Sequence, residues 1–170
     1  HSHNLETEEN KDEIIEQIAV AAIKYADLLS NRTTDYIFDP KKFVDVEGKT
    51  GPYLLYTTIR MKSLLKKAKE NNLDYSKYTK ISEEVEKELI TLLLAKNKVL
   101  HKAYDTKELN VISDYLYQHT STYSKIYEKC HVKTQKDKNI QENWLLLTKN
   151  VYDTNVELLT ILGIEIPEKM

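Results

Sequence analysis

The chain has 170 residues, a formal net charge of −2 and a single cysteine. A chain of this length can form one domain that buries about 70% of its unfolded surface, so it needs neither a metal ion nor a disulfide to fold. The small net charge excludes indiscriminate electrostatic binding of nucleic acid, which requires a broadly basic surface. No apolar run reaches the roughly 20 residues of a membrane-spanning helix. We therefore expect a cytoplasmic protein without a membrane partner.

The composition favours helices. Only three Gly and three Pro interrupt the chain, which is otherwise rich in Lys, Glu and Leu. We predict an all-α helical bundle of about five to seven helices. Residues 1–10 are expected to be a tag remnant and a disordered lead-in, because His1-Ser2-His3 is typical of an expression tag. Residues 11–170 are expected to form the single helical domain.

Apolar residues at helical spacing predict a first helix from about Lys11 to Ser30. The following stretch, residues 31–49, lacks that period and is predicted to be a long ordered loop. Four apolar side chains are expected to hold the loop in place: Tyr36, Phe38, Phe43 and Val46.

The next helix has clear start and stop signals. Pro52 suits its first turn, with Thr50 or Gly51 as the cap. The helix is predicted to run to about Glu70, where Asn71-Asn72 ends it.

Four further helices are predicted, at about Ser82–Ala95, Lys98–Ala103, Thr106–Cys130 and Lys138–Leu162. In the third of these, apolar positions alternate at spacings of three and four residues, which is typical of a seam that faces a bundle. His119 lies on that seam and is interpreted as a hydrogen-bonded core histidine. Gly163 is the expected stop of the last helix.

The start of the helix at residues 51–70 carries the most informative pattern. At about 100° per residue, Tyr53, Tyr56 and Arg60 fall within roughly a 60° arc, opposite a stripe of apolar residues. Lys67 falls in the same arc two turns later. Unstacked RNA bases stack on aromatic faces, and phosphates accept charge-assisted hydrogen bonds from guanidinium groups. We predict that this face contacts single-stranded RNA.

The same helix carries a basic run. Five cations occur before its first acid, Glu70: Arg60, Lys62, Lys66, Lys67 and Lys69. They could neutralise several phosphates, or they could form an ordinary solvated helix face. Four of the twelve tyrosines are predicted to line contacts between helices and not to contact RNA: Tyr115, Tyr123, Tyr127 and Tyr152.

Several stretches share their order and spacing with a known domain. The first is Gly-x-Thr-Gly-Pro-Tyr-x-x-Tyr-x-x-x-Arg at 48–60, preceded by Ala-Ile-Lys-Tyr-Ala-Asp-Leu at 22–28. Others are Asp-Tyr-Leu-Tyr at 114–117 and the ending Leu-Leu-x-x-Leu-Gly-Ile-x-Ile-Pro-Glu-x-Met at 158–170. Together they resemble the C-terminal, DALR-type anticodon-binding domain of arginyl-tRNA synthetases. The pattern departs from the family at Trp144, where such domains often carry an Arg.

The resemblance implies that the chain binds the anticodon loop of arginine tRNA as part of an arginine–tRNA ligase, a class I synthetase. Its partners would be tRNA and the ligase's own catalytic domain, and not DNA. The resemblance places ATP and Mg²⁺ in that absent catalytic domain and implies no cofactor here. Tyr53 and Tyr56 would stack splayed bases, and Arg60 would bind a base edge or a phosphate. The family ending implies that Met170 would end a tail packed near the same loop. The basic run of the helix, and not the resemblance, predicts that Lys67 would contact a phosphate.

No catalytic or metal-binding pattern was found. The chain lacks a Gly-rich phosphate loop and a nucleophile elbow, and no histidine has the spacing of a zinc ligand. The tetrapeptide at 60–63 is superficially similar to the KMSKS loop of class I synthetases but lies inside an amphipathic helix. The fragment is therefore expected to be non-catalytic by itself.

Two alternatives stay open. One is a stand-alone tRNA-binding adaptor with the same fold, and the other is a helical protein-interaction module without an RNA partner. The reading frame upstream distinguishes the first from the ligase, because only a ligase gene encodes HIGH and KMSKS motifs there. The protein-interaction module, unlike the ligase or the adaptor, would show no salt-dependent tRNA binding.

Overall fold

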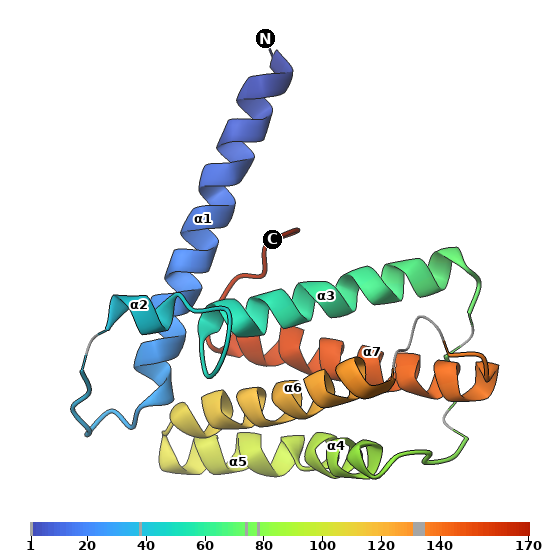
Figure 1. Ribbon diagram of the computed structural model, residues 1–170. Coiled ribbons are helices and arrows are strands. Elements are labelled where there is room, and N and C mark those ends of the chain that lie inside the picture. Colours follow the sequence, from blue (N-terminus) through green and yellow to red (C-terminus); the bar gives the residue numbers. More distant parts are fainter. Residues whose placement is uncertain (1, 38, 74, 78, 131–134) are drawn as a thin grey trace.

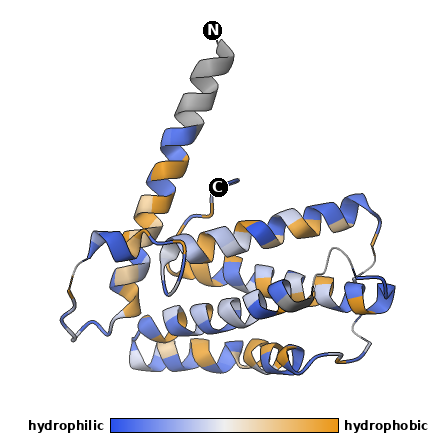
Figure 2. Ribbon diagram, in the orientation of Figure 1, coloured by the Kyte–Doolittle hydropathy of each residue, from blue (hydrophilic) through white to orange (hydrophobic). Residues whose placement is uncertain are grey.

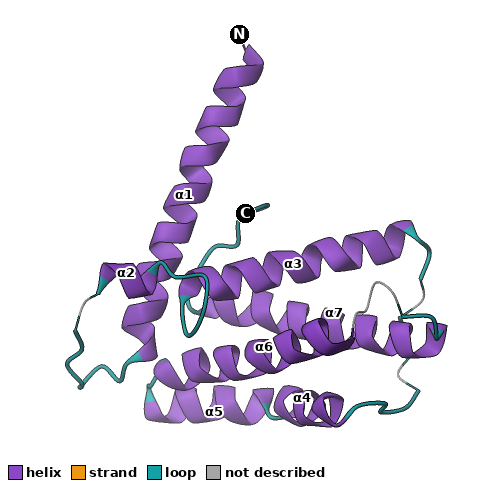
Figure 3. Ribbon diagram, in the orientation of Figure 1, coloured by secondary structure: helices purple, strands orange, loops and turns teal. Residues whose placement is uncertain are grey.

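The computed structural model describes residues 2–37, 39–73, 75–77, 79–130 and 135–170. All regular secondary structure in these ranges is helical (Figure 3), which confirms the all-α prediction. The helices are α1 (Ser2–Leu29), α2 (Pro40–Phe43), α3 (Gly51–Glu70), α4 (Glu84–Leu94), α5 (Lys96–Thr106), α6 (Asn110–Cys130) and α7 (Lys138–Ile161). Figure 1 shows α3, α6 and α7 running alongside one another, with α4 and α5 along α6 and with α1 projecting from one end.

The first helix is longer than predicted. It begins at Ser2 and not near Lys11, so the segment expected as a disordered lead-in is largely helical. No Gly or Pro occurs before residue 40, and the lead-in is rich in Glu and other residues that tolerate a helix. The assignment of residues 1–10 to a tag, and the domain boundary at residue 11, stay predictions.

The long loop after α1 contains the short helix α2, which the sequence did not predict. Asp39 caps it by accepting a hydrogen bond from the Lys41 backbone N–H at 3.2 Å. Of the side chains expected to hold the loop, Phe43 is half-buried, with its ring 6.2 Å from that of Tyr36. Val46 is exposed, so its expected anchoring role is wrong, and Phe38 lies outside the described residues.

Helix α3 has the predicted bounds and an unusually close neighbour at its start. Thr50 is the cap, and its Oγ1 accepts a hydrogen bond from the Tyr53 N–H at 3.2 Å. A Cβ added at Gly51 would lie 2.2 Å from the carbonyl oxygen of Ala21 in α1. The backbones of α1 and α3 therefore touch at this point, and only glycine leaves room for the contact.

The later helices differ from prediction mainly at their ends. Helix α4 begins at Glu84 and not at Ser82, with Glu83 as its cap, and the Ser82 hydroxyl donates to the carboxylate of buried Glu86. Helix α5 is longer than expected and ends at Thr106, followed by the capping residue Lys107, whose backbone is left-handed with φ of 58°. Helix α6 consequently begins at residue 110. Gly163, with φ of 67°, follows the end of α7 as predicted.

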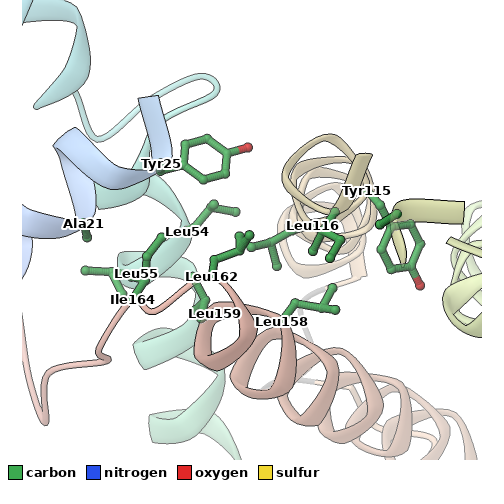
Figure 4. Close-up of a cluster of buried hydrophobic side chains, with 12 residues drawn as sticks. Ala21, Tyr25, Leu54, Leu55, Tyr115, Leu116, Leu158, Leu159, Leu162 and Ile164 are labelled. Carbon is green, nitrogen blue, oxygen red and sulfur yellow. The ribbon is translucent and has the colours of Figure 1, made fainter. Parts of the chain in front are cut away.

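Two apolar clusters form the core. The first joins α1, α3, α6 and α7 to the C-terminal tail (Figure 4). Its members in the figure include Tyr25, Leu54, Leu116, Leu159 and Ile164. The second, core cluster 2, lies further along α3, α6 and α7. Figure 2 shows apolar residues spread along every long helix of the bundle, consistent with burial between helices as the main source of stability.

The predicted seam of α6 is confirmed for its central positions. Ile112, Leu116, Tyr123 and Ile126 are buried. Leu109 is 44% exposed because it precedes the helix, and the side chain of Cys130 lies outside the described residues.

A buried polar network crosses the bundle beside this seam. The ring of His119 lies between two oxygens: Nδ1 is 2.8 Å from the Tyr115 carbonyl oxygen, and Nε2 is 2.7 Å from Oδ1 of the Asn155 side-chain amide. That amide also donates to Thr58 Oγ1 at 2.9 Å. The network joins α3, α6 and α7, and burial lowers the pKa of His119 to about 4. The prediction of a hydrogen-bonded core histidine is confirmed.

Replacing Gly51 by Ala should destabilise the protein by about 1–3 kcal/mol, since the new methyl group meets backbone atoms that cannot rotate away. An unhindered Gly→Ala change in a helix would instead stabilise it. Urea unfolding measures the difference. Gly48→Ala is the control, because its Cβ would meet nothing within 4 Å and would incur only the cost of a left-handed backbone. If Gly51→Ala is as stable as wild type, the backbones of α1 and α3 do not touch at this point.

Acid should destabilise the protein through His119. In the unfolded chain its pKa is about 6.5, above the folded value of about 4. Well above pH 6.5, protonation of His119 does not affect the free energy of unfolding. As the pH falls from 6.5 towards 4, that free energy decreases, by about 2 kcal/mol at pH 5. Urea unfolding at pH 7.5 and pH 5 should show a smaller loss for His119→Gln than for wild type. His101→Gln, at an exposed position, should retain the wild-type loss; equal losses in all three proteins would refute this assignment.

Candidate nucleic-acid interface

Side chains of α3 and α6 meet along one side of the bundle. We call the surface formed by Tyr53, Tyr56, Arg60, Tyr117 and Tyr127 the α3–α6 face. The ring centroids of Tyr53 and Tyr117 lie 5.8 Å apart. The guanidinium carbon of Arg60 lies 3.8 Å from the ring centroid of Tyr127 and 5.9 Å from that of Tyr56. The face is thus a row of rings with one cation set among them.

The guanidinium of Arg60 is held by rings and not by a carboxylate. Among the residues that the structure describes, the ion pairs all involve other cations. Contact with the Tyr127 ring restrains the guanidinium and leaves its charge unneutralised. Such a group can donate paired hydrogen bonds to a phosphate or a base edge.

The two tyrosines of α3 are buried to different extents. The Tyr56 side chain is 45% exposed. Tyr53 is half-buried against the first core cluster, and its hydroxyl lies 2.9 Å from Ser124 Oγ. Burial raises the pKa of the Tyr53 phenol. Helical spacing placed both on one arc, but only Tyr56 is exposed.

Helix α6 contributes more to the face than the sequence indicated. Tyr127 was assigned to contacts between helices, and Tyr117 was given no site role. Both are half-buried and border the α3 residues. The available signal was the recurrence of Tyr117, Ser124 and Tyr127 at intervals of seven and three, which sets them on one side of α6. The interpretation of Tyr115 and Tyr123 is confirmed, since both are buried.

A lysine closes one end of the face. Lys49 Nζ lies 2.9 Å from Asp114 Oδ1 and 5.4 Å from the ring centroid of Tyr117. Its charge is therefore already paired, unlike that of Arg60. Lys49 orients the Tyr117 ring, and the cation available to a ligand is Arg60.

The remaining predicted site residues lie away from this row of rings. Lys67 is exposed, two turns along α3 from Arg60. Met170 is 45% exposed at the end of the tail, which ends between α1 and α3 (Figure 1). Hydrogen bonds fix the tail to α1: Lys24 donates to the Gly163 carbonyl, and Gln17 donates to Glu165 at 3.4 Å. The predicted role of Met170 stays a prediction.

Trp144, where the family pattern departs, lies in the core. It is buried, and its Nε1–H donates to the Glu86 carboxylate at 3.1 Å. The same carboxylate accepts the Glu83 backbone N–H at 2.9 Å. Position 144 therefore belongs to the bundle's interior in this chain and is not part of the α3–α6 face.

Within the described ranges, no group of three or more His, Cys, Asp or Glu side chains is placed to hold a metal ion. His131 lies outside those ranges. None of the described helices is long and apolar enough to cross a membrane.

Comparison with known families matches residues 54–170, more than half of the chain, to the family described as "DALR anticodon binding domain". The chain belongs to the DALR anticodon-binding domain family. Residues 1–40 match a second family, described as "tRNA synthetases class I (R), catalytic domain". The DALR match covers α4 to α7 and all of α3 beyond its first turn, and so includes Tyr56, Arg60 and most of the face.

Curated relatives of this DALR domain carry the name arginine–tRNA ligase. The protein of Francisella tularensis subsp. tularensis (strain WY96-3418) is 34% identical over 176 residues, covering 100% of this chain and 30% of the relative. That of Alkaliphilus oremlandii (strain OhILAs) is 36% identical over 163 residues, covering 94% of this chain and 27% of the relative. The chain thus spans about 30% of the length of such relatives.

Two solved structures share the fold. The arginyl-tRNA synthetase of Plasmodium falciparum superposes with a TM-score of 0.83 at 24% identity, over 99% of this chain and 30% of that one. The Thermus thermophilus enzyme gives 0.77 at 23% identity, over 91% and 27%. At these identities the likeness supports the DALR fold and not a particular site.

The difference in depth between the two tyrosines is testable. Tyr53→Phe should lower the free energy of unfolding by about 1 kcal/mol, because it removes the hydrogen bond to Ser124. Tyr56→Phe is the matched control and should leave stability unchanged, since its ring is exposed. Urea unfolding of the three proteins compares them. Equal stabilities would mean that the Tyr53 hydroxyl is not held in the bundle.

Proposed function

We propose that this chain recognises the anticodon loop of arginine tRNA as the anticodon-binding part of an arginine–tRNA ligase. The observation that carries the proposal is the Arg60 guanidinium, which lies between the rings of Tyr56 and Tyr127 without a carboxylate partner among the described residues. The DALR family and the ligase relatives support the choice of tRNA. In such a ligase, ATP and Mg²⁺ would bind in the catalytic domain.

The face suits an unpaired base. The exposed Tyr56 ring can stack on a splayed base, a contact worth about 1–3 kcal/mol. Arg60, already restrained by Tyr127, can then donate to the base edge or to the adjoining phosphate. The Tyr53 hydroxyl is hydrogen-bonded to Ser124, and the Tyr53 ring packs beside that of Tyr117 in the α3–α6 face. Lys67, two turns further on, would bind a phosphate.

Electrostatic attraction would be local. The chain has a net charge of −2, but α3 carries five cations and a single acid at its last position. This basic helix can attract the phosphates of one hairpin while the rest of the surface repels nucleic acid in general. The proposal therefore requires binding that weakens with salt and is selective for a tRNA loop over duplex DNA.

The ligase is favoured over the stand-alone adaptor by one observation. Residues 1–40, which include α1, match the catalytic-domain family of class I synthetases. We infer that α1 leads from a catalytic domain into the bundle. Ile15 and Ile23, exposed on α1, would then be covered by that domain. The predicted cytoplasmic location agrees with this function, because protein synthesis takes place in the cytoplasm. The location itself stays a prediction.

Arg60→Ala and Tyr56→Ala should each weaken binding of transcribed arginine tRNA about tenfold, because one loses the charge and the other the stacking surface. Fluorescence titration at two salt concentrations measures this. Arg60→Lys should recover only part of the affinity, since an ammonium group lacks the paired donors of a guanidinium.

Tyr104→Ala is the matched control, because Tyr104 is 72% exposed and lies on α5, away from α3. It should bind as tightly as wild type. Wild-type affinity in both α3 variants would refute the assigned face. The absence of any salt-dependent tRNA binding by the wild-type chain would instead favour the protein-interaction module.

A further inference from the structure

A concave surface lies at the other end of α3. It is a cleft of about 680 Å³, lined by residues from the end of α3, from the loop that follows and from α7. We call it the α3–α7 cleft. The residues that matter to its chemistry are Lys69 on α3, Leu73 and Tyr75 in the loop, and Leu146 and Lys149 on α7.

The cleft combines an apolar floor with a cationic rim. Leu73 and Tyr75 are half-buried against core cluster 2 and also line the cleft, and Leu146 lines it from α7. Lys69 is exposed at its edge, while Lys149 is paired with Asp153. An aromatic and apolar floor suits a base, and an unpaired ammonium group at the rim suits its phosphate.

A series of lysines links the cleft to the α3–α6 face across the outer side of α3. By helix geometry, Lys69 lies about 14 Å further along the axis than Arg60 and about half a turn around it. Lys66 and Lys67 are exposed between them. The ion pairs of the described residues involve none of these lysines, although six other lysines are paired.

We propose that the α3–α7 cleft takes a nucleotide of the same RNA strand whose unpaired base contacts the α3–α6 face. Its base would stack on Tyr75 beside Leu146, and Lys69 would bind its phosphate. Lys66 and Lys67 would bind the phosphates between the two subsites. This inference rests on the proposed function and adds a second nucleotide subsite on the opposite border of α3.

The probe is a fluorescently labelled anticodon stem–loop of arginine tRNA. Tyr75→Leu keeps apolar volume but removes the ring, and should raise Kd about fivefold or more. Lys69→Gln removes one exposed charge, and should raise Kd about threefold and reduce the salt slope by about 0.7. Tyr104→Leu and Lys102→Gln are matched controls on the exposed side of α5 and should bind as wild type.

The outcomes separate this inference from the proposed function. If Arg60→Ala weakens binding but Tyr75→Leu and Lys69→Gln do not, the cleft subsite is overturned and the α3–α6 face stands. If the α5 controls weaken binding as much as the cleft variants, the subsite is also overturned, because attraction is then unspecific. If the wild-type chain does not bind the stem–loop, both proposals fail. Should thermal melting show that Tyr75→Leu is unfolded, Lys69→Gln decides alone.

Discussion

The relative placement of α3, α6 and α7 depends on the buried polar network around His119. Its imidazole contacts the Tyr115 carbonyl within α6 and the Asn155 amide of α7, and that amide reaches Thr58 of α3. Buried polar groups are costly when unpaired, so sliding any one helix along another would leave several of them without partners. This cost favours a single register, in which Arg60 lies opposite Tyr127 and Tyr53 lies opposite Ser124.

The distribution of charge separates structural cations from available ones. Lys49 is paired with Asp114, and Lys96 with Glu157, so these charges serve contacts between elements. The α3 cations from Arg60 to Lys69 have no such partners among the described residues. An acidic protein can therefore present one helix as an attractive surface for an anion. That arrangement favours selectivity over strength, because the surrounding negative charge discourages unspecific binding.

Helix α1 is joined to the elements that carry the α3–α6 face. Its backbone touches Gly51 at the start of α3, and the Tyr25 hydroxyl donates to the Ser113 carbonyl of α6 at 3.0 Å. Lys24 donates to the Gly163 carbonyl at the start of the tail. These three contacts restrain the C-terminal half of α1 against the bundle. Under the proposed function, these contacts would set the direction from which a catalytic domain approaches the α3–α6 face.

Local chemistry along the chain determined much of this architecture. Thr50, Pro52 and Asn71 delimit α3 because caps and proline act on their own turn, and the α6 seam follows from helical spacing alone. Only the tertiary structure decided that Tyr53 is half-buried, that Tyr127 joins Arg60, and that a cleft lies at the end of α3. Periodicity tells which residues share one side of a helix, whereas depth and cross-helix partners depend on how separate helices pack, which involves contacts distant in sequence.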